Sequence, residues 1–191
     1  MSKPWASTPF ALLPIPTAST CSNPSLLSVC IEMANVHNAL LRGLNSIYLQ
    51  APHISQPADI MDLMLYTKAW ADTVFHHHSG EEKLFFPVLS ELAKEAGLGP
   101  DVMEGNVAQH HAFEEGIKDT MKWCEDVRDG GKEFDAKVLI GLIDSFAPVL
   151  CQHLHDEIET LVKLEKCDGK KIEQAMAETA QAGIKTADVV C

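Results

Sequence analysis

The stretch HHSGEEKLFFP, residues 77–87, places two histidines, two glutamates and a proline within a short segment. His77 and Glu81 are four residues apart, so on an α-helix they lie on one face and can point at one place. The same spacing recurs in two further pairs, His110/Glu114 and His153/Glu157. Imidazole nitrogen and carboxylate oxygen together suit iron, manganese or zinc. Three such pairs in one chain indicate a metal centre inside a helical bundle.

The size and charge of the chain limit the classes of protein to which it can belong. Its 191 residues, 46% of them hydrophobic, suffice for one globular domain with a sizeable core. A formal charge of −12 disfavours nucleic acid and anionic membrane surfaces as partners. No apolar run reaches the roughly 18 residues of a membrane span, and the N-terminus has no apolar signal-peptide core. We therefore expect a soluble, cytoplasmic protein with no nucleic-acid and no membrane partner.

The cysteines give no sign of a thiolate metal site. Six are scattered along the chain without a C-x-x-C pair, so zinc-ribbon and thioredoxin-like sites have no support. Reduced thiols in a reducing compartment are the expected state. Buried Cys30 and Cys124 would act as small hydrophobic residues.

The distribution of proline and glycine predicts an all-α fold in three parts. Residues 1–22 carry four prolines and are expected to form an extended arm that packs along a bundle of residues 23–166. A short C-terminal helix and tail, residues 167–191, complete the chain. Long helices are expected at residues 24–51, 57–96, 100–128 and 134–166, with a short fifth helix at 170–182. Short connections between the long helices predict an up-down-up-down four-helix bundle.

One interruption is expected inside the second long helix. Pro87 lies within it and should kink or break it, because proline has no backbone N–H and its ring collides with the preceding turn.

The apolar stripe of each helix indicates which polar side chains face the core. When the stripes are read at alternating spacings of three and four residues, their polar members are Thr67 and seven candidate metal ligands. These seven are His37, His77, Glu81, His110, Glu114, His153 and Glu157. His111 falls on a solvated face, and His155 is expected to be at least partly exposed. His78/Glu82 remains an alternative to His77/Glu81, because its own stripe is also mostly apolar.

Electrostatics favours a metal centre over a set of buried acids. Each buried ionised glutamate without a partner would cost several kcal/mol. Three of them together would rival the whole stability of a domain, about 5–15 kcal/mol. Two divalent cations would offset the three negative charges, so the core would be neutralised by a dinuclear centre.

Three segments resemble the hemerythrin-like, or HHE cation-binding, domain family. They are residues 77–87, Gln109–Phe113 and His153–Glu157, with His37 at the place of the family's first-helix histidine. The N-terminal arm, with the segment Pro-Trp-Ala-Ser-Thr-Pro-Phe at residues 4–10, is similar to that of stand-alone members of the family from filamentous fungi. The resemblance implies a four-helix bundle that holds two iron ions joined by two carboxylates and an oxo or hydroxo bridge.

The same resemblance assigns a role to individual residues. His37, His77, His110 and His153 would be terminal ligands, and Glu81 and Glu157 would bridge the two irons. Oxygen-carrying hemerythrin has a second histidine where this chain has Glu114, and an aspartate one residue beyond the position of Glu157. The expected set of ligands, four histidines and three glutamates, disfavours reversible oxygen carriage. It contains more carboxylate than the site of oxygen-carrying hemerythrin, and so lies part-way toward the carboxylate-rich centres of ferritin-like oxidases.

Three functions follow from these expectations. The first is a di-iron protein that reacts with dioxygen or peroxide, for example as an oxidase or oxygenase of a small molecule. The second is a metal-handling protein for iron storage or sensing, or for zinc or manganese. The third is an enzyme that uses the metal as a Lewis acid, with the arm and Trp5 covering a substrate pocket. No sequence signature identifies catalytic residues.

Overall fold

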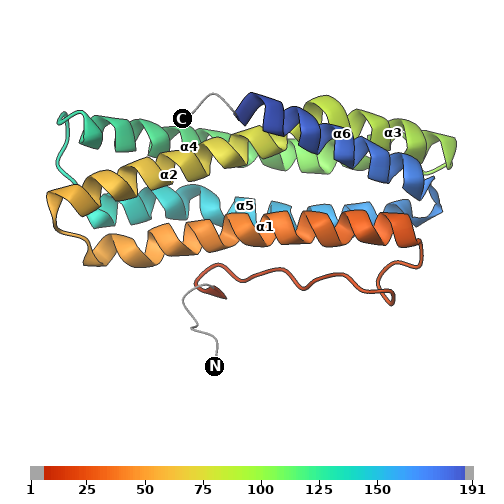
Figure 1. The fold of residues 1–191 in the computed structure, drawn as a ribbon, viewed down its shortest axis with the longest axis horizontal. Coiled ribbons are helices and arrows are strands. Elements are labelled where there is room, and N and C mark those ends of the chain that lie inside the picture. The colour runs from red at the N-terminus through yellow and green to blue at the C-terminus, as the bar shows by residue number, and fades with distance from the viewer. Residues whose placement is uncertain (1–6, 188–191) are drawn as a thin grey trace. The chain divides into compact units, whose positions relative to one another are not determined.

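The fold is an all-α helical bundle with an extended N-terminal segment (Figure 1). The computed structural model describes residues 7–187, and the side chains of residues 7–183. Every regular element in that range is helical. The α-helices are α1 Pro24–Gln50, α2 Pro57–Gly80, α3 Phe86–Glu95, α4 Glu104–Arg128, α5 Ala136–Lys163 and α6 Gly169–Ala187. Shorter elements are the 3-10 turns η2 Ala51–His53, η4 Asp101–Met103 and η5 Leu164–Lys166, and the π-helical segment η3 Glu81–Phe85.

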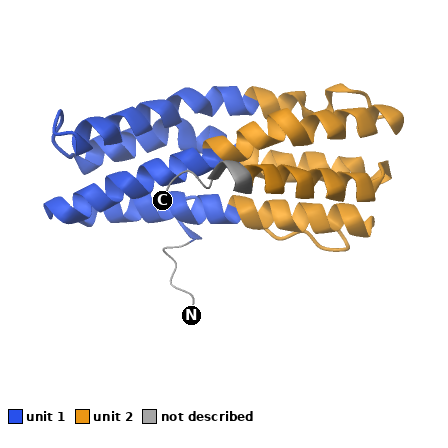
Figure 2. Cartoon of the chain, turned by 45° about the horizontal axis from the view of Figure 1, so that its top comes forward, with its two compact units in different colours: residues 1–12, 38–74, 109–152 blue, residues 13–37, 75–108, 153–191 orange. Residues whose placement is uncertain are grey.

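The residues cluster into two compact units (Figure 2). Unit 1 comprises residues 1–12, 38–74 and 109–152, and unit 2 comprises residues 13–37, 75–108 and 153–191. Helices α1, α2, α4 and α5 each contribute a part to both units. The predicted division into arm, bundle and C-terminal helix stays a prediction, since these units group residues by contact and not by position along the chain.

The core of unit 1 is organised around Trp70 on α2. Its indole Nε1–H donates a hydrogen bond to the carbonyl oxygen of Leu40 on α1, at 2.9 Å. Its ring stacks on Phe146 of α5, with ring centroids 6.1 Å apart. A buried indole with its one donor satisfied contributes a large apolar area without a desolvation penalty. Trp70 is thus a packing residue, as its position on the apolar stripe predicts.

Close helix packing in unit 1 depends on Gly116 of α4. A Cβ at this position would lie 2.8 Å from Phe146 Cβ and 3.1 Å from Ser145 Oγ on α5. We expect Gly116→Ala to destabilise the protein by about 1–3 kcal/mol, because overpacking outweighs the better helix propensity of alanine. Urea unfolding followed by circular dichroism measures the change.

A matched control is available on the neighbouring helix. Gly141 of α5 is exposed, and a Cβ added there meets no atom within 4 Å. Gly141→Ala should therefore stabilise the protein by roughly 0.5–1 kcal/mol. Equal effects of the two substitutions would show that the Gly116 contact is not a constraint.

In unit 2 the arm is fixed to the start of α1 and to residues 165–167, in and directly after η5. The Asn23 side chain accepts a hydrogen bond from the backbone N–H of Leu26, which caps α1, and donates to the carbonyl of Cys167. The backbone N–H of Ser22 donates to Glu165 Oε1 at 2.5 Å. Leu13 is buried. In unit 1, Phe10 exchanges two backbone hydrogen bonds with the side chain of Asn45 on α1. The prediction that the arm packs against the bundle is therefore confirmed at Phe10, Leu13 and Ser22, whereas Trp5 lies outside the described residues.

The interruption expected at Pro87 is present. Residues Glu81–Phe85 form a π-helical turn, and Pro87 lies in the first turn of α3 directly after it. Pro87 cannot donate to the carbonyl of Lys83, four residues earlier, and the wider turn accommodates that missing bond. Helix α6 packs against this turn and against α3. The fifth helix, expected at residues 170–182, thus runs further and covers the π-helical segment.

The five described cysteines are all free thiols. Burial raises the pKa of Cys30 and of Cys124 to about 12 and that of Cys151 to about 11. The neutral thiol is therefore the state of these three side chains near neutral pH. Cys30 and Cys124 are buried among apolar residues, as expected.

Among the described residues, one helix is long and apolar enough to cross a membrane when only length and composition are considered. It is Ala136–Lys166, with a mean hydropathy of 1.3 in its most apolar window. The core helix of a soluble protein meets the same criterion, and the apolar face of α5 lies in the core with Leu139, Ile143, Phe146 and Leu150 buried. The absence of a membrane partner stays a prediction.

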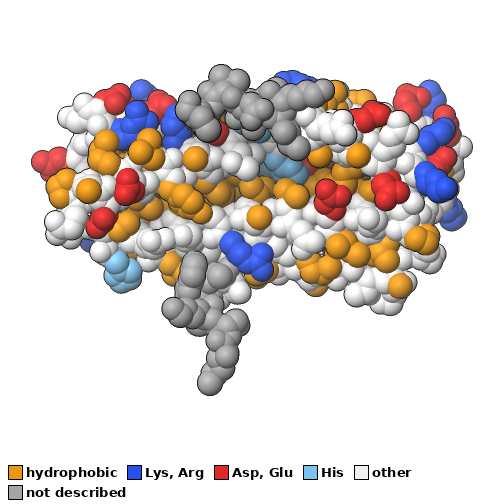
Figure 3. Space-filling view, viewed as in Figure 1, with side chains coloured by type: hydrophobic (Ala, Val, Ile, Leu, Met, Phe, Trp, Pro, Cys, Tyr) orange, Lys and Arg blue, Asp and Glu red, His pale blue; other side chains and the backbone are white. Residues whose placement is uncertain are grey.

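The charged side chains on the face shown in Figure 3 are scattered. Lysine and arginine are interspersed with acidic and apolar groups and form no continuous basic surface on this face.

Candidate metal centre

Six histidine and glutamate side chains gather in unit 2. One comes from α1, two from the end of α2, one from the first residue of the π-helical segment η3, and two from α5. They are His37, His77, His78, Glu81, His153 and Glu157. All but His77 are buried, and His37, His153 and Glu157 have no exposed surface. Such a dense set of ionisable groups in a core requires a compensating partner.

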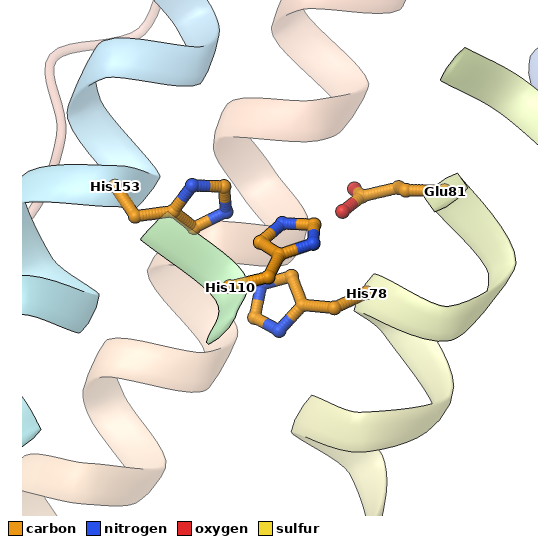
Figure 4. A group of neighbouring side chains, drawn as sticks. All are labelled: His78, Glu81, His110 and His153. Atoms are coloured by element: carbon orange, nitrogen blue, oxygen red, sulfur yellow. The ribbon is translucent and has the colours of Figure 1, made fainter. Parts of the chain in front are cut away.

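The side chains form two groups with the composition of metal sites. One group is His78, Glu81, His110 and His153, and the other is His37, His77 and Glu81. Within each group, one potential ligand atom per residue lies within 4.8 Å of the others. Figure 4 shows the side chains of the first group, in which His110 is supplied by α4, pointing toward one another. Glu81 belongs to both groups.

Helical geometry explains why Glu81 is shared. At about 100° per residue, His78 follows His77 by about 100° around the helix, and Glu81 lies about 40° from His77, between the two. Each histidine can therefore lie on one side of the carboxylate. His77 Nε2 is 3.0 Å from Glu81 Oε1. The sequence left His77 and His78 as alternatives, and the structure brings both of them to the cluster.

Glu157 on α5 also contacts a histidine of each group. Its Oε2 lies 3.3 Å from His37 Nε2 and 3.6 Å from His153 Nε2. His37 belongs to one group and His153 to the other. Glu81 and Glu157 are thus two carboxylates that each lie near histidines of both groups.

The backbone fixes a proton on Nδ1 of His37. Its Nδ1 is 2.9 Å from the carbonyl oxygen of Leu154, which can only accept, so Nδ1–H is the donor. Nε2 of a neutral ring then presents a lone pair to the Glu157 carboxylate. Two acceptors at 3.3 Å require a cation between them, either a proton or a metal ion. A backbone carbonyl that orients the distal nitrogen is the arrangement that metal-binding histidines generally adopt.

Glu81 and Glu157 make the cluster electrostatically costly without metal. Burial raises the pKa of Glu81 well above its ordinary value of 4.5, and the neighbouring charges of Glu157 and Glu82 raise it further. Two divalent cations among these donors would remove that repulsion. By donor chemistry, charge and geometry, the residues present fit a pair of metal ions.

The structure does not bring Glu114 to either group. Its side chain is 37% exposed and pairs with Lys118 at 2.5 Å and with His111 at 3.8 Å. The hydrogen bond from Lys118 lowers the pKa of the Glu114 carboxyl. The expectation of a seventh ligand, with Glu114 deciding the chemistry of the site, therefore has no support in its position.

The reason lies in the periodicity of α4. After His110 the buried stripe continues by three residues to Phe113, whose ring lies 5.8 Å from the His110 ring, and not by four residues to Glu114. Phe113 is apolar and Glu114 is charged, so side-chain hydrophobicity in the sequence could have predicted that Phe113 is the buried one. One turn before His110, Asn106 is buried on the same stripe.

Two comparisons relate this chain to known proteins. The family model described as "Hemerythrin HHE cation binding domain" matches residues 32–164. A curated relative, "Dimeric xanthone biosynthesis cluster protein R11" from Cryptosporiopsis sp. (strain 8999), is 37% identical over 150 residues, which are 78% of this chain and 55% of that protein. The chain thus spans about half the length of this relative. No solved structure shows significant similarity.

Proposed function

Because this chain belongs to the hemerythrin HHE cation-binding family, we propose that its cluster holds two iron ions that react with dioxygen or peroxide. Metal binding follows from the family and from the His/Glu groups. The identity of the metal and its reaction are the proposed part.

The observation that carries the proposal is the pair of shared carboxylates. Glu81 belongs to both groups, and Glu157 contacts His37 of one group and His153 of the other. A mononuclear site does not require two buried carboxylates that each reach two sets of nitrogen ligands. This arrangement supports a centre of two metal ions, which Glu81, Glu157 and the histidines of both groups would hold.

The protein's own groups would serve three purposes in such a reaction. The Leu154 carbonyl orients His37, so the ring approaches the cluster through Nε2. Burial of His37, His153 and Glu157 excludes bulk water. Imidazole and carboxylate ligands also stabilise ferric as well as ferrous iron, which supplies the one-electron steps that dioxygen chemistry needs.

The name of the relative supports a role in small-molecule metabolism. That protein is named for a cluster of dimeric xanthone biosynthesis. We infer that the reaction at the metal centre of this chain is coupled to oxidation of a small organic molecule, and not to storage of iron.

Anaerobic loading with Fe(II) followed by exposure to air tests the proposal. We expect about two irons per chain by elemental analysis, rapid uptake of dissolved oxygen measured with an electrode, and a change in absorption that purging with argon does not reverse. A fully reversible change would indicate oxygen carriage. Stable metal binding without oxygen uptake would contradict the proposed reaction and favour a metal-handling protein.

A further inference from the structure

A cavity of about 300 Å³ lies between the N-terminal arm and α5. The arm contributes residues 13–16 and Thr20, and α5 contributes His155, Ile158, Glu159 and Val162. All of these residues belong to unit 2. The volume is at the lower end of the range for small-molecule sites, so a single-ring ligand is the appropriate size.

The cavity is distinct from the metal cluster, although α5 takes part in both. His153 and Glu157 face the cluster, whereas His155 and Glu159 follow each of them by two residues, about 200° around the helix. The second His/Glu pair of α5 therefore faces the arm. A ligand in the cavity needs no metal ion for its binding.

The lining has an apolar body and a small polar part. Leu13, Ile158 and Val162 present aliphatic surface. Pro14 and Pro16 add aliphatic pyrrolidine rings, which pack well against aromatic rings. They have no backbone N–H, so at these two positions the arm can offer only carbonyl acceptors. This composition favours a ligand with a flat, mostly apolar skeleton.

The polar groups of the cavity select the ligand's functional group. His155 and Glu159 lie one helical turn apart, so a single ligand group can reach both. A hydroxyl can donate to the Glu159 carboxylate and accept from an imidazole N–H of His155, so this one group satisfies both side chains. A carboxylate or phosphate would face Glu159 and a chain of formal charge −12.

We propose that the cavity between the arm and α5 binds a small neutral aromatic molecule through its phenolic hydroxyl. The ring lies between the prolines of the arm and the aliphatic side chains of α5. The hydroxyl lies between His155 and Glu159. The arm is thus one wall of a binding site for a phenol.

Titration of the full-length, isotope-labelled protein with 4-methylphenol, followed by NMR, tests this site. We expect chemical-shift changes at residues 13–16 and 155–162 that saturate with a dissociation constant in the high-micromolar to millimolar range, as for a fragment-sized ligand. 4-Methylanisole, which cannot donate, should bind at least fivefold more weakly, and 4-methylbenzoate should not bind. Equal binding of the phenol and the anisole would overturn the role of the hydroxyl.

Two variants distinguish binding of the phenol in the cavity from non-specific binding to apolar surface. Val162→Trp fills the cavity and should abolish the shifts, and Glu159→Gln should weaken binding about fivefold to tenfold. Glu173→Gln on α6 makes the same charge change at an exposed position outside the cavity and should leave binding unchanged. Unchanged affinity in both cavity variants would overturn the site. The titration is repeated on metal-free protein, where equal binding is expected, so failure of the metal centre does not affect the result.

Discussion

Replacing Glu81 with alanine is expected to lower the bound metal from two ions per chain to fewer than one. Glu81 is the residue common to both groups of potential ligands, so its loss removes a donor from each group at once. The substitution also leaves Glu157 as the remaining buried carboxylate of the cluster. Elemental analysis after anaerobic loading and desalting measures the stoichiometry.

Glu114→Ala is the matched control for this substitution. Glu114 was expected to be a ligand from its spacing to His110, but its partners are Lys118 and His111 at the surface. Metal content should therefore stay at two ions per chain, with a stability change within about 0.5 kcal/mol, as for surface positions in general. If Glu114→Ala lost metal and Glu81→Ala kept it, the cluster described above would not be the metal site.

Removing the metal is expected to lower the thermal unfolding temperature by roughly 5–11 °C. Metal held at a hundredfold excess over its dissociation constant adds about 2.7 kcal/mol to the folded state. For a chain of this size each kcal/mol corresponds to about 2–4 °C. Differential scanning calorimetry of loaded and chelator-treated protein at one pH gives the comparison.

The metal-free protein should also become less stable as the pH rises above about 4.5. The pKa of Glu81 is raised above that ordinary value in the folded state by burial and by Glu157, so the folded protein holds this proton more tightly than the unfolded chain does. The free energy of unfolding therefore decreases as the pH rises from the pKa of Glu81 in the unfolded chain to its pKa in the folded protein. Above the folded-state pKa, Glu81 adds no further dependence on pH. Metal binds the ionised carboxylate, so the loaded protein should show the opposite trend.

Glu81→Gln tests whether this one carboxyl causes the pH dependence. The amide keeps the shape of the side chain and cannot ionise, so the loss of stability with rising pH should be reduced in the metal-free variant. Urea unfolding between pH 4.5 and 8 measures it. The same slope in the variant and in the parent protein would assign the dependence to another group.

Helix positions were predictable because their signals are local. The prediction of a first helix at residues 24–51 is confirmed by α1, Pro24–Gln50, whose cap is the side chain of Asn23. The interruption near Pro87 follows from the covalent structure of proline and is present as the π-helical turn Glu81–Phe85. Spacing also predicted that His77/Glu81 and His153/Glu157 each share a helix face, and the structure places all four side chains in the cluster. A helix places residues four apart on one face whatever surrounds it.

The choice between adjacent positions on one helix was not predictable with the same certainty. A helix turns by about 100° per residue, so two neighbouring side chains can both border a buried stripe. On α4 the buried stripe passes through Phe113, and Glu114 instead forms an ion pair with Lys118. On α2 both His77 and His78 reach the cluster. The outcome depends on which neighbouring helices lie opposite.

The sequence by itself determined that this protein is all-helical and that its helices carry histidine and glutamate on their buried faces, because helical periodicity and proline act within a few residues. The tertiary structure alone decided that Glu81 is shared between two groups, that Glu157 contacts both His37 and His153, and that the arm and α5 line a common cavity. Each of these relations joins residues from different segments of the chain. Packing sets the distance between such segments, and no local pattern encodes it.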